Sequence, residues 1–386
     1  MIINVEDARR AARRRLPRIF FDYVDGGSFA EETLAANRAD FSRWTLVQRV
    51  LNDVSQRDLT TRFLGAAHPL PFMLGPVGFL GLYAGNGEIA AARAAHAAGI
   101  PLCLSTFSIA SLATLRATTS GPLAFQLYVM SDRGIGDELL EQARAAGVDT
   151  LFLTVDTAIT SVRERDLRNG FRSLTRITPG LALRLATRPG WCLDMLRAGL
   201  PEVGAVAHRP EFGKGALEQA SNLSRRIDTR LSWRDVEDLR ARWSGKLVLK
   251  GILSPEDALA ARAAGADAIV VSNHGGRQLD GACSTIAALP GIAEALDGSL
   301  EILFDGGIRR GADIVKALAL GASGVLLGRA YVYGLAARGE AGVARILAHL
   351  TEELSLTLGL MGLTSIAELK ALGPAALSRR VASTVD

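Results

Sequence analysis

The sequence lacks the features that mark a disulfide-stabilised, zinc-binding, secreted or membrane-spanning protein. Its three cysteines, Cys103, Cys192 and Cys283, are far apart, odd in number and without CxxC spacing, so a reducing compartment is expected. No run of about 18 apolar residues predicts a membrane-spanning helix. The N-terminal "MIINVEDARRAARRRLP" has acidic residues and no apolar core, which argues against a secretory signal peptide.

The charge balance gives little support for a nucleic-acid partner. The formal net charge is +4 over 386 residues, and no dense basic stripe stands out, although only five of the 44 basic residues are lysines. No GxGxxG fingerprint follows an early strand, which disfavours NAD. With 48% hydrophobic and 22% charged residues, the chain is expected to fold around a large core.

A repeated pattern of an alanine-rich helix end, a glycine and an apolar strand runs through the chain. It occurs in "ARAAHAAGIPLCLST" (92–106), "ARAAGVDTLFLTVD" (143–156), "ARAAGADAIVVSN" (261–273) and "ALALGASGVLLGR" (317–329). Glycine at this point suits a helix C-cap, which needs a left-handed backbone. The apolar runs do not alternate with polar residues, so both strand faces should be covered, as in a parallel sheet.

Four further apolar runs, at 71–78, 122–129, 246–252 and 301–307, bring the number of predicted strands to eight. Eight strands, most of them separated by helical stretches, predict an α/β fold of the (β/α)8 TIM-barrel type, with a doubly wound open sheet as the structural alternative. We expect residues 1–65 to form an N-terminal helical cap and residues 66–386 to form the barrel.

After the fourth predicted strand, residues 167–231 form an unusually long connection, which we expect to be a mobile excursion. One interpretation is a surface excursion with a short helix. The other is contact with a membrane surface or a partner through apolar residues and neighbouring arginines. The apolar residues of that second interpretation are Leu181, Leu183, Leu185, Trp191 and Leu193.

Polar residues and glycines stand at the C-terminal ends of the predicted strands, which meet at one face of a barrel, where active sites lie. "FDGGIRRG" (304–311) and "LGRA" (327–330) follow strands seven and eight, where barrels usually bind phosphate, and they contain Arg309 and Arg329. Lys250 ends an apolar strand. Two interpretations remain open for it: a Schiff-base lysine, or a lysine beside a flavin ring.

The stretch "VSNHGGRQLD" (271–280) places a histidine and an arginine three residues apart after a strand. His274 could remove a proton while Arg277 binds an adjacent carboxylate, and Asp156 could orient and stabilise the imidazolium. Tyr23 and Tyr128 offer hydroxyl groups, and Arg163 offers a second guanidinium.

These motifs resemble the FMN-dependent L-2-hydroxy acid dehydrogenases and oxidases, which include flavin-type L-lactate dehydrogenase, mandelate dehydrogenase and glycolate oxidase. The resemblance covers nearly the whole chain. It rests on "SNHGGRQLD", "FDYVDGG", "GPVGF", "FQLYV", "LTVD", "RERD", "LVLKGI", "FDGGIRRGADIVKALALGA" and "LLGRA". "GPVGFLGLYAGNGE" and "GILSPEDA" look most like the bacterial respiratory, quinone-linked L-lactate dehydrogenases, and "VRERDLRN" looks like mandelate dehydrogenase.

The resemblance implies FMN as cofactor and a role for each matching residue. His274 would be the catalytic base with Asp156 as its partner, and Tyr128 would contact the substrate oxygens. Tyr23, Tyr128, Arg163 and Arg277 would bind the substrate. The residues implied in FMN binding are Pro76, Val77, Gly78, Ser105, Gln126, Thr154, Lys250, Ser272, Asp305, Gly306, Gly307, Arg309, Gly328 and Arg329. No metal is implied.

The implied reaction is oxidation of an L-2-hydroxy acid, such as L-lactate, to the 2-keto acid. A mandelate-type or biosynthetic 2-hydroxy acid is the alternative substrate, and a Schiff-base lyase is the alternative of a different class. Quinone, a protein or oxygen could accept the electrons, and Gly78, where several oxidases carry alanine, favours an acceptor other than oxygen. We also expect a cytoplasmic homotetramer in peripheral contact with the inner face of the cell membrane. Candidate walls of the substrate pocket are Phe79, Leu80, Tyr83, Phe107 and residues of the long connection.

Overall fold

The computed structural model describes residues 1–171 and 179–380, and its centre is a closed barrel of eight parallel strands. The strands are β4 (Phe72–Leu74), β5 (Leu102–Ser105), β6 (Leu123–Leu127), β7 (Thr150–Thr154), β8 (Lys246–Ile252), β9 (Ala268–Val271), β10 (Glu301–Phe304) and β11 (Gly324–Leu327). Neighbours in the sequence are neighbours in the barrel, and β11 pairs with β4 to close it. The predicted TIM barrel is confirmed, and the open-sheet alternative is wrong because the sheet has no free edge.

The repeated glycines act as predicted from their position. Gly99, Gly147, Gly265 and Gly321 all adopt positive φ angles, between 65° and 111°, just after helices that lead into strands. The strand side chains are buried on both sides. Met73, Phe152, Val248 and Leu303 belong to a separate cluster inside the barrel, while alternate residues pack outward under the helices. The barrel interior is therefore a packed core, which leaves chemistry to its open end.

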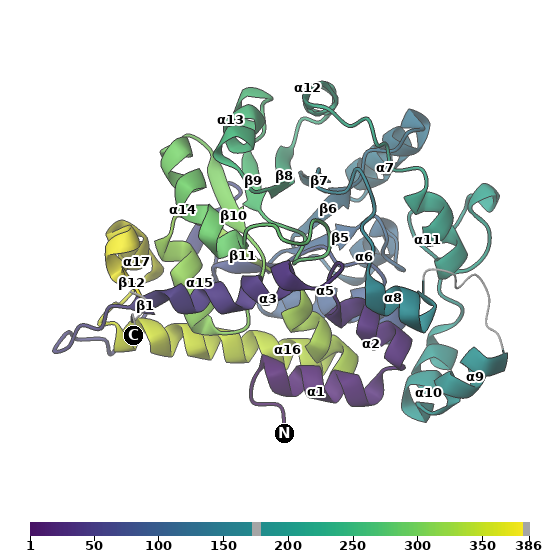
Figure 1. Cartoon of the computed structure of the whole chain (residues 1–386), viewed down its shortest axis with the longest axis horizontal. Coiled ribbons are helices and arrows are strands. Elements are labelled where there is room, and N and C mark those ends of the chain that lie inside the picture. Colours follow the sequence, from purple (N-terminus) through teal and green to yellow (C-terminus); the bar gives the residue numbers. More distant parts are fainter. Residues whose placement is uncertain (172–178, 381–386) are drawn as a thin grey trace.

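Helices surround the barrel and extend beyond it (Figure 1). They include α4 (Leu80–Tyr83), α5 (Gly87–Ala97), α6 (Leu112–Thr118), α7 (Arg133–Ala145), α12 (Trp233–Arg242), α13 (Pro255–Ala263), α14 (Thr285–Leu296), α15 (Gly311–Ala319), α16 (Arg329–Leu360) and α17 (Ile366–Leu372). The motif "SPEDA" explains one helix start, because Pro255 opens α13 and the Ser254 hydroxyl accepts a hydrogen bond from the Asp257 amide at 3.1 Å. Helix α16 is broken at Arg338–Gly339, where both residues have non-helical dihedral angles.

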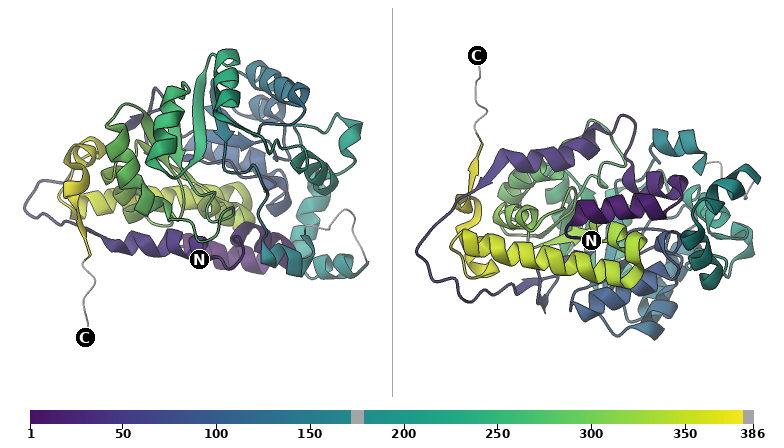
Figure 2. Two further views of the ribbon diagram at one scale, coloured as in Figure 1. Left: turned by 45° about the horizontal axis from the view of Figure 1, so that its top comes forward. Right: turned by 90° about the horizontal axis from the view of Figure 1, so that it is seen from below.

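The N-terminal residues contact the two ends of the barrel. Helix α1 (Val5–Arg15) runs along α16 (Figure 2), while α2 (Arg18–Asp25) and α3 (Glu32–Ala39) lead toward the carboxyl ends of the strands. The Ser28 amide donates to the Gly276 carbonyl there, and Asn37 exchanges hydrogen bonds with Asn273. The hairpin of β2 (Thr61–Phe63) and β3 (Ala66–His68) contributes Phe63 to the barrel's interior cluster. A short pair, β1 (Trp44–Leu46) with β12 (Leu377–Arg379), joins the segment that follows α3 to the C-terminal part of the described chain.

The long connection after β7 carries helices α8 (Glu164–Asn169), α9 (Pro179–Ala186), α10 (Pro189–Ala198) and α11 (Ala216–Ser224), and its residues 172–178 lie outside the described part. The five apolar residues expected to meet a membrane or partner differ in burial, and Leu185 is partly buried against the core. Leu181 and Trp191 are buried, and the Trp191 indole donates to the Leu82 carbonyl at 2.9 Å, so these two anchor the helices inward. Leu183 and Leu193 are exposed. No helix among the described residues is long and apolar enough to cross a membrane.

Candidate active site

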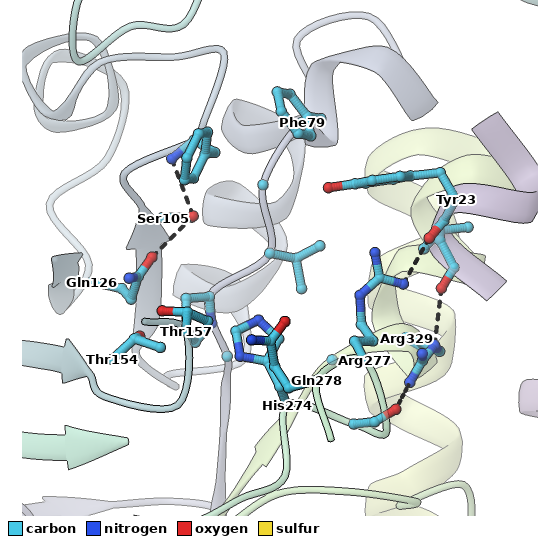
Figure 3. Close-up of a pocket in the computed structure, with 18 of the residues that line it drawn as sticks. Tyr23, Phe79, Ser105, Gln126, Thr154, Thr157, His274, Arg277, Gln278 and Arg329 are labelled. Carbon is cyan, nitrogen blue, oxygen red and sulfur yellow. Dashed lines mark hydrogen bonds between the residues drawn. The ribbon is translucent and has the colours of Figure 1, made fainter. Parts of the chain in front are cut away.

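A cavity of about 570 Å³ opens at the carboxyl ends of the barrel strands and collects nearly all of the predicted site residues (Figure 3). The predicted residues that line it are Tyr23, Pro76, Val77, Gly78, Ser105, Gln126, Tyr128, Thr154, Arg163, Lys250, His274, Arg277, Asp305, Gly306, Gly307, Arg309, Gly328 and Arg329. Asp156 and Ser272 do not line the cavity. Each lies behind a lining residue to which it is hydrogen-bonded, His274 and Lys250 respectively.

His274 follows β9 in a strained backbone conformation. Its φ is +57°, and Gly275 and Gly276 continue with φ of +65° and +72°. A histidine in the left-handed region is uncommon and is typical of functional sites. Glycine is required at the next two positions for a second reason: a Cβ on Gly275 would lie 2.8 Å from the Arg329 guanidinium, and one on Gly276 would lie 2.5 Å from the Leu34 amide. The turn therefore directs His274 toward the cavity while α3 and Arg329 pack closely behind it.

His274 and Asp156 form a partly buried pair, with Nδ1 and Oδ1 3.0 Å apart. Burial on its own would raise the pKa of Asp156, but His274 and Lys250 hold it below its usual value. The ionised carboxylate can only accept, so Nδ1 carries the proton and Nε2 presents its lone pair. Burial lowers the pKa of His274, which Asp156 only partly offsets. The imidazole is therefore neutral near pH 7 and can act as a base.

Two arginines that line the cavity lie against the Tyr23 ring. The Arg277 guanidinium lies 4.9 Å from the centre of the Tyr23 ring, and that of Arg163 lies 5.3 Å from it. Arg277 also donates to the Tyr23 and Gly26 carbonyls at the end of α2, where a helix carries partial negative charge. Burial and the nearby Arg163 lower the pKa of Arg277. Two cations so close together provide a binding site for an anion such as a carboxylate.

Lys250 is buried at the end of β8 and paired with Asp305. Its Nζ lies 3.1 Å from Asp305 Oδ2 and donates to the Ser272 hydroxyl at 2.9 Å. Burial would lower the pKa of Lys250, but the carboxylates of Asp305 and Asp156 raise it above its ordinary value. Lys250 is therefore a fixed positive charge on the cavity wall. A protonated amine cannot attack a carbonyl, so this geometry does not favour the Schiff-base interpretation.

The cavity wall fits FMN on several independent observations. Among the described residues, Gln126 Nε2 and Asp305 Oδ1 are buried without a hydrogen-bond partner, so a ligand with polar edges would satisfy them. Gly306 and Gly307 have φ of +103° and +85°, and a Cβ on Gly307 would lie 1.9 Å from the Asn37 carbonyl oxygen, so only glycine fits there.

The charges near these glycines suit the phosphate of FMN. Burial, with Arg277 and Arg309 nearby, lowers the pKa of Arg329 to about 9. Arg329 donates to the Val24, Gly26 and Gly275 carbonyls, which fixes its guanidinium in place. An anion beside Arg309 and Arg329 would offset their mutual repulsion.

Several lining residues were not predicted. Gln278 donates from Nε2 to the Asp156 and Ile159 carbonyls at 2.8 and 3.0 Å, and so connects the loop after β9 with the loop after β7. Thr157 also lines the cavity, and so do Phe171 and part of α11, which belong to the long connection that was expected to supply pocket walls without named residues. Gln278 lies within "SNHGGRQLD" and could have been found there, whereas nothing local marks α11. Of the predicted pocket walls, Phe79, Tyr83 and Phe107 line the cavity. Leu80 does not, because it is buried in the core.

Comparison with known proteins gives one consistent result. The model of the FMN-dependent dehydrogenase family matches residues 12–374. An L-lactate dehydrogenase of Caulobacter vibrioides is 46% identical over 372 residues, which cover 96% of each chain. One of Pseudomonas aeruginosa is also 46% identical, covering 96% of this chain and 98% of the relative.

Solved structures agree with these relatives. The crystal structure of the monotopic membrane protein (S)-mandelate dehydrogenase has a TM-score of 0.93 at 40% identity, covering 98% of this chain and all of the other. A mandelate oxidase with (S)-4-hydroxymandelic acid has a TM-score of 0.84 at 36% identity, covering 98% and 99% of the two chains.

Proposed function

Since the chain belongs to the FMN-dependent dehydrogenase family and uses FMN to oxidise a 2-hydroxy acid to the 2-keto acid, we propose from this premise which residues perform each part of the reaction. Bound FMN would supply the acceptor for the two electrons that leave the substrate and for the one proton that the protein residues do not take up. The substrate R–CH(OH)–COO⁻ also loses two protons as it becomes R–CO–COO⁻. The protein residues must therefore bind the carboxylate, accept a proton and stabilise charge.

Arg277 and Arg163 bind the substrate carboxylate. Both guanidiniums lie over the Tyr23 ring, and Arg277 is held by two backbone carbonyls, so little conformational freedom is lost on binding. Binding here places the C2 hydroxyl group of the acid toward His274 and Tyr128, which line the same cavity. Burial raises the pKa of Tyr128, so its hydroxyl remains a proton donor to the substrate oxygens.

His274 accepts one substrate proton at Nε2, either from C2 or from the hydroxyl group. As the imidazolium forms, Asp156 stabilises it through the 3.0 Å hydrogen bond at Nδ1. Lys250 supplies a fixed positive charge on the cavity wall, which would favour negative charge on bound FMN. Asp156 acts through His274 and is a positioning residue.

The observation that carries this proposal is the neutral His274 paired with Asp156 beside two carboxylate-binding arginines. The test is anaerobic reduction of the FMN-loaded protein by 2-hydroxy acids, followed by flavin absorbance. We expect His274→Gln to retain FMN while reduction is abolished. Reduction of the His274→Gln variant at the wild-type rate would refute the role of His274. A Schiff-base lyase would instead be trapped by borohydride with a carbonyl substrate, with no flavin bleaching.

For the electron acceptor, we propose a quinone reached at a membrane surface through α9 and α10. Four leucines of this region, Leu183, Leu193, Leu196 and Leu200, are exposed, and Arg184 and Arg197 lie on the same two helices. Exposed leucines beside arginines suit a helix that lies in a bilayer interface. Helix α10 is joined to α1 by an ion pair of 2.6 Å between Arg15 and Asp194, so the arginine-rich α1 lies beside it.

Vesicle flotation tests the membrane contact. We expect the protein to float with vesicles of phosphatidylcholine and phosphatidylglycerol, and the double variant Leu193→Ser, Leu196→Ser to remain at the bottom of the gradient. Leu51→Ser is the matched control, because Leu51 is fully exposed in a loop outside these helices. Equal flotation of the double variant and the wild type would refute the contact. The predicted homotetramer is checked by light scattering of the same samples.

A further inference from the structure

Asp25 is a buried carboxylate at the C-terminal end of α2, and it takes no part in the proposed reaction steps. It accepts hydrogen bonds from α1, α8 and α16, against which α2 packs (Figure 1). Arg9 of α1 binds both of its oxygens, with Nε 2.5 Å from Oδ1 and Nη2 2.8 Å from Oδ2. Arg165 of α8 donates to Oδ2 at 2.9 Å, and the Tyr333 hydroxyl of α16 donates to Oδ1 at 2.8 Å. Burial alone would raise the pKa of Asp25, but Arg9 and Tyr333 hold it well below its usual value, so Asp25 is a fixed negative charge that joins four helices.

The backbone on either side of Asp25 holds two arginines of the cavity. Arg277 donates to the Tyr23 and Gly26 carbonyls at 2.7 and 3.0 Å, and Arg329 donates to the Gly26 carbonyl at 2.7 Å. In Figure 3, dashed lines join both guanidiniums to backbone oxygens below the Tyr23 ring. The groups that fix the end of α2 therefore also fix the orientation of Arg277.

The ion pair between Asp25 and Arg165 extends this support to the second arginine proposed to bind the carboxylate. Arg163 is the residue just before α8, and Arg165 follows two residues later in the first turn of that helix. The Arg165 guanidinium then reaches across to Asp25 Oδ2. The pair joins the helix end that holds Arg277 to the helix start that carries Arg163, and so it sets how far apart the two lie.

The charge of Asp25 is needed because the site around it is strongly positive. Burial and the neighbouring Arg163 already lower the pKa of Arg277. Arg9 and Arg165 bring two more guanidiniums to the end of α2. Without the carboxylate charge these groups would repel one another with nothing between them, and the helix end would shift to relieve the repulsion.

We infer that Asp25 is a positioning residue for substrate binding, and that it holds Arg163 and Arg277 at the separation that fits the substrate carboxylate. Asp25 does not line the cavity, so it acts through these two arginines. The inference rests on the proposed function and names the group that prepares its carboxylate site.

The first experiment measures steady-state oxidation of L-lactate and (S)-mandelate by the FMN-loaded protein, with a redox dye as electron acceptor. We expect Asp25→Asn to raise KM for the better of the two acids at least about fivefold and to change kcat less than about threefold, because a misplaced guanidinium weakens binding while His274 still accepts the proton. The dissociation constant of the corresponding 2-keto acid, measured from the change in flavin absorbance, should rise by a similar factor. Glu6→Gln is the matched control, because Glu6 also pairs with Arg9, at 3.1 Å, but lies on α1 itself; it should leave KM and kcat unchanged.

The outcomes separate the inference from the proposed function. A KM of Asp25→Asn within about twofold of wild type, or a loss confined to kcat, overturns the inference and leaves the proposed function intact. If the wild-type protein oxidises neither acid, the proposed function fails, and the inference with it.

The second experiment asks whether Asp25 acts through Arg277. If it does, the double variant Asp25→Asn, Arg277→Leu should have a KM within about twofold of that of Arg277→Leu alone, because residues that act as a unit are not additive. A KM raised by the product of the two single effects would show that Asp25 acts independently, which overturns the inference. Arg165→Met keeps the apolar stem of the side chain and decides the question if Asp25→Asn does not fold. We expect it to raise KM at least about threefold, and an unchanged KM would overturn the inference.

Discussion

Asp156→Asn tests how the protein prepares its catalytic base. Asparagine has nearly the same shape as aspartate, and its carbonyl oxygen can still accept a hydrogen bond from His274 Nδ1, now 3.0 Å from Oδ1. The substitution therefore removes the negative charge and places an NH2 group where the buried Oδ2 now lies. Hydrogen bonds to charged groups contribute about 1.5–3 kcal/mol and neutral ones about 0.5–1.5 kcal/mol, so the imidazolium would lose about 1–2 kcal/mol of stabilisation.

We expect the rate of flavin reduction at pH 8 to fall at least about tenfold, because each 1.4 kcal/mol corresponds to a factor of ten. A loss of only about 1 kcal/mol would correspond to about fivefold. We expect a larger loss because, among the described residues, Asp156 Oδ2 has no hydrogen-bond partner, and an amide NH2 group there would be buried without an acceptor.

The pH dependence gives a second, independent readout. The base is lost only when His274 becomes protonated, and burial lowers the pKa of His274. The wild-type kcat/KM should therefore decrease only as the pH drops below about 6.5, the ordinary pKa of histidine. Asp156 raises the pKa of His274, so its loss should move this acid limb to lower pH. A purely structural defect would lower the rate without moving the limb. Asp149→Asn, at the opposite end of β7, is the matched control. A rate within twofold of wild type, or a limb that moves to higher pH, would contradict this role of Asp156.

Three further substitutions test the rest of the site. Arg277→Leu should raise KM at least about tenfold without loss of FMN, because a charge-assisted contact of about 1.5–3 kcal/mol is removed; an unchanged KM would remove Arg277 from the carboxylate site. Lys250→Met should slow flavin reduction and lower the flavin midpoint potential, since a positive charge is lost; an unchanged potential would contradict the electrostatic role. Gln278→Leu removes two hydrogen bonds to the loop after β7 and should lower kcat as well as raise KM, with FMN content retained; a change in KM alone would limit Gln278 to substrate binding.

Much of this architecture could be predicted from local sequence. Glycines after alanine-rich helices indicated the turns into strands, and all four have the left-handed backbone that this position needs. The C-terminal ends of the eight apolar runs indicated one catalytic face, because parallel strands in a barrel all end there. His274, Arg277 and Lys250 were found in this way, since a charged or titratable residue at the end of a buried strand is costly unless it has a function.

Other features depend on contacts between distant segments. The exposed and buried apolar residues of α9 and α10 look alike in sequence, and only packing against Leu82 of α4 and Phe20 of α2 separates Trp191 from Leu193. Ser272, predicted to contact the cofactor, lies behind the cavity wall, where its hydroxyl accepts a hydrogen bond from Lys250 Nζ. Both distinctions depend on which neighbour lies beside a residue, which local pattern does not encode.

The sequence by itself therefore predicted the barrel, because strand order follows from residue type and position along the chain, while the cofactor class and the roles of the reacting groups were implied by its resemblance to the FMN-dependent family. Only the tertiary structure decided how the groups act on one another. It brought Asp156 and His274, 118 residues apart, to hydrogen-bonding distance. It also placed Asp305 beside Lys250, which raises the pKa of the lysine and keeps it protonated. It also gathered Phe171, Tyr23, Phe79, Phe107 and Tyr128 into one wall. Proton affinity and apolar contact depend on distance and burial in space, and these exist only once the chain has folded.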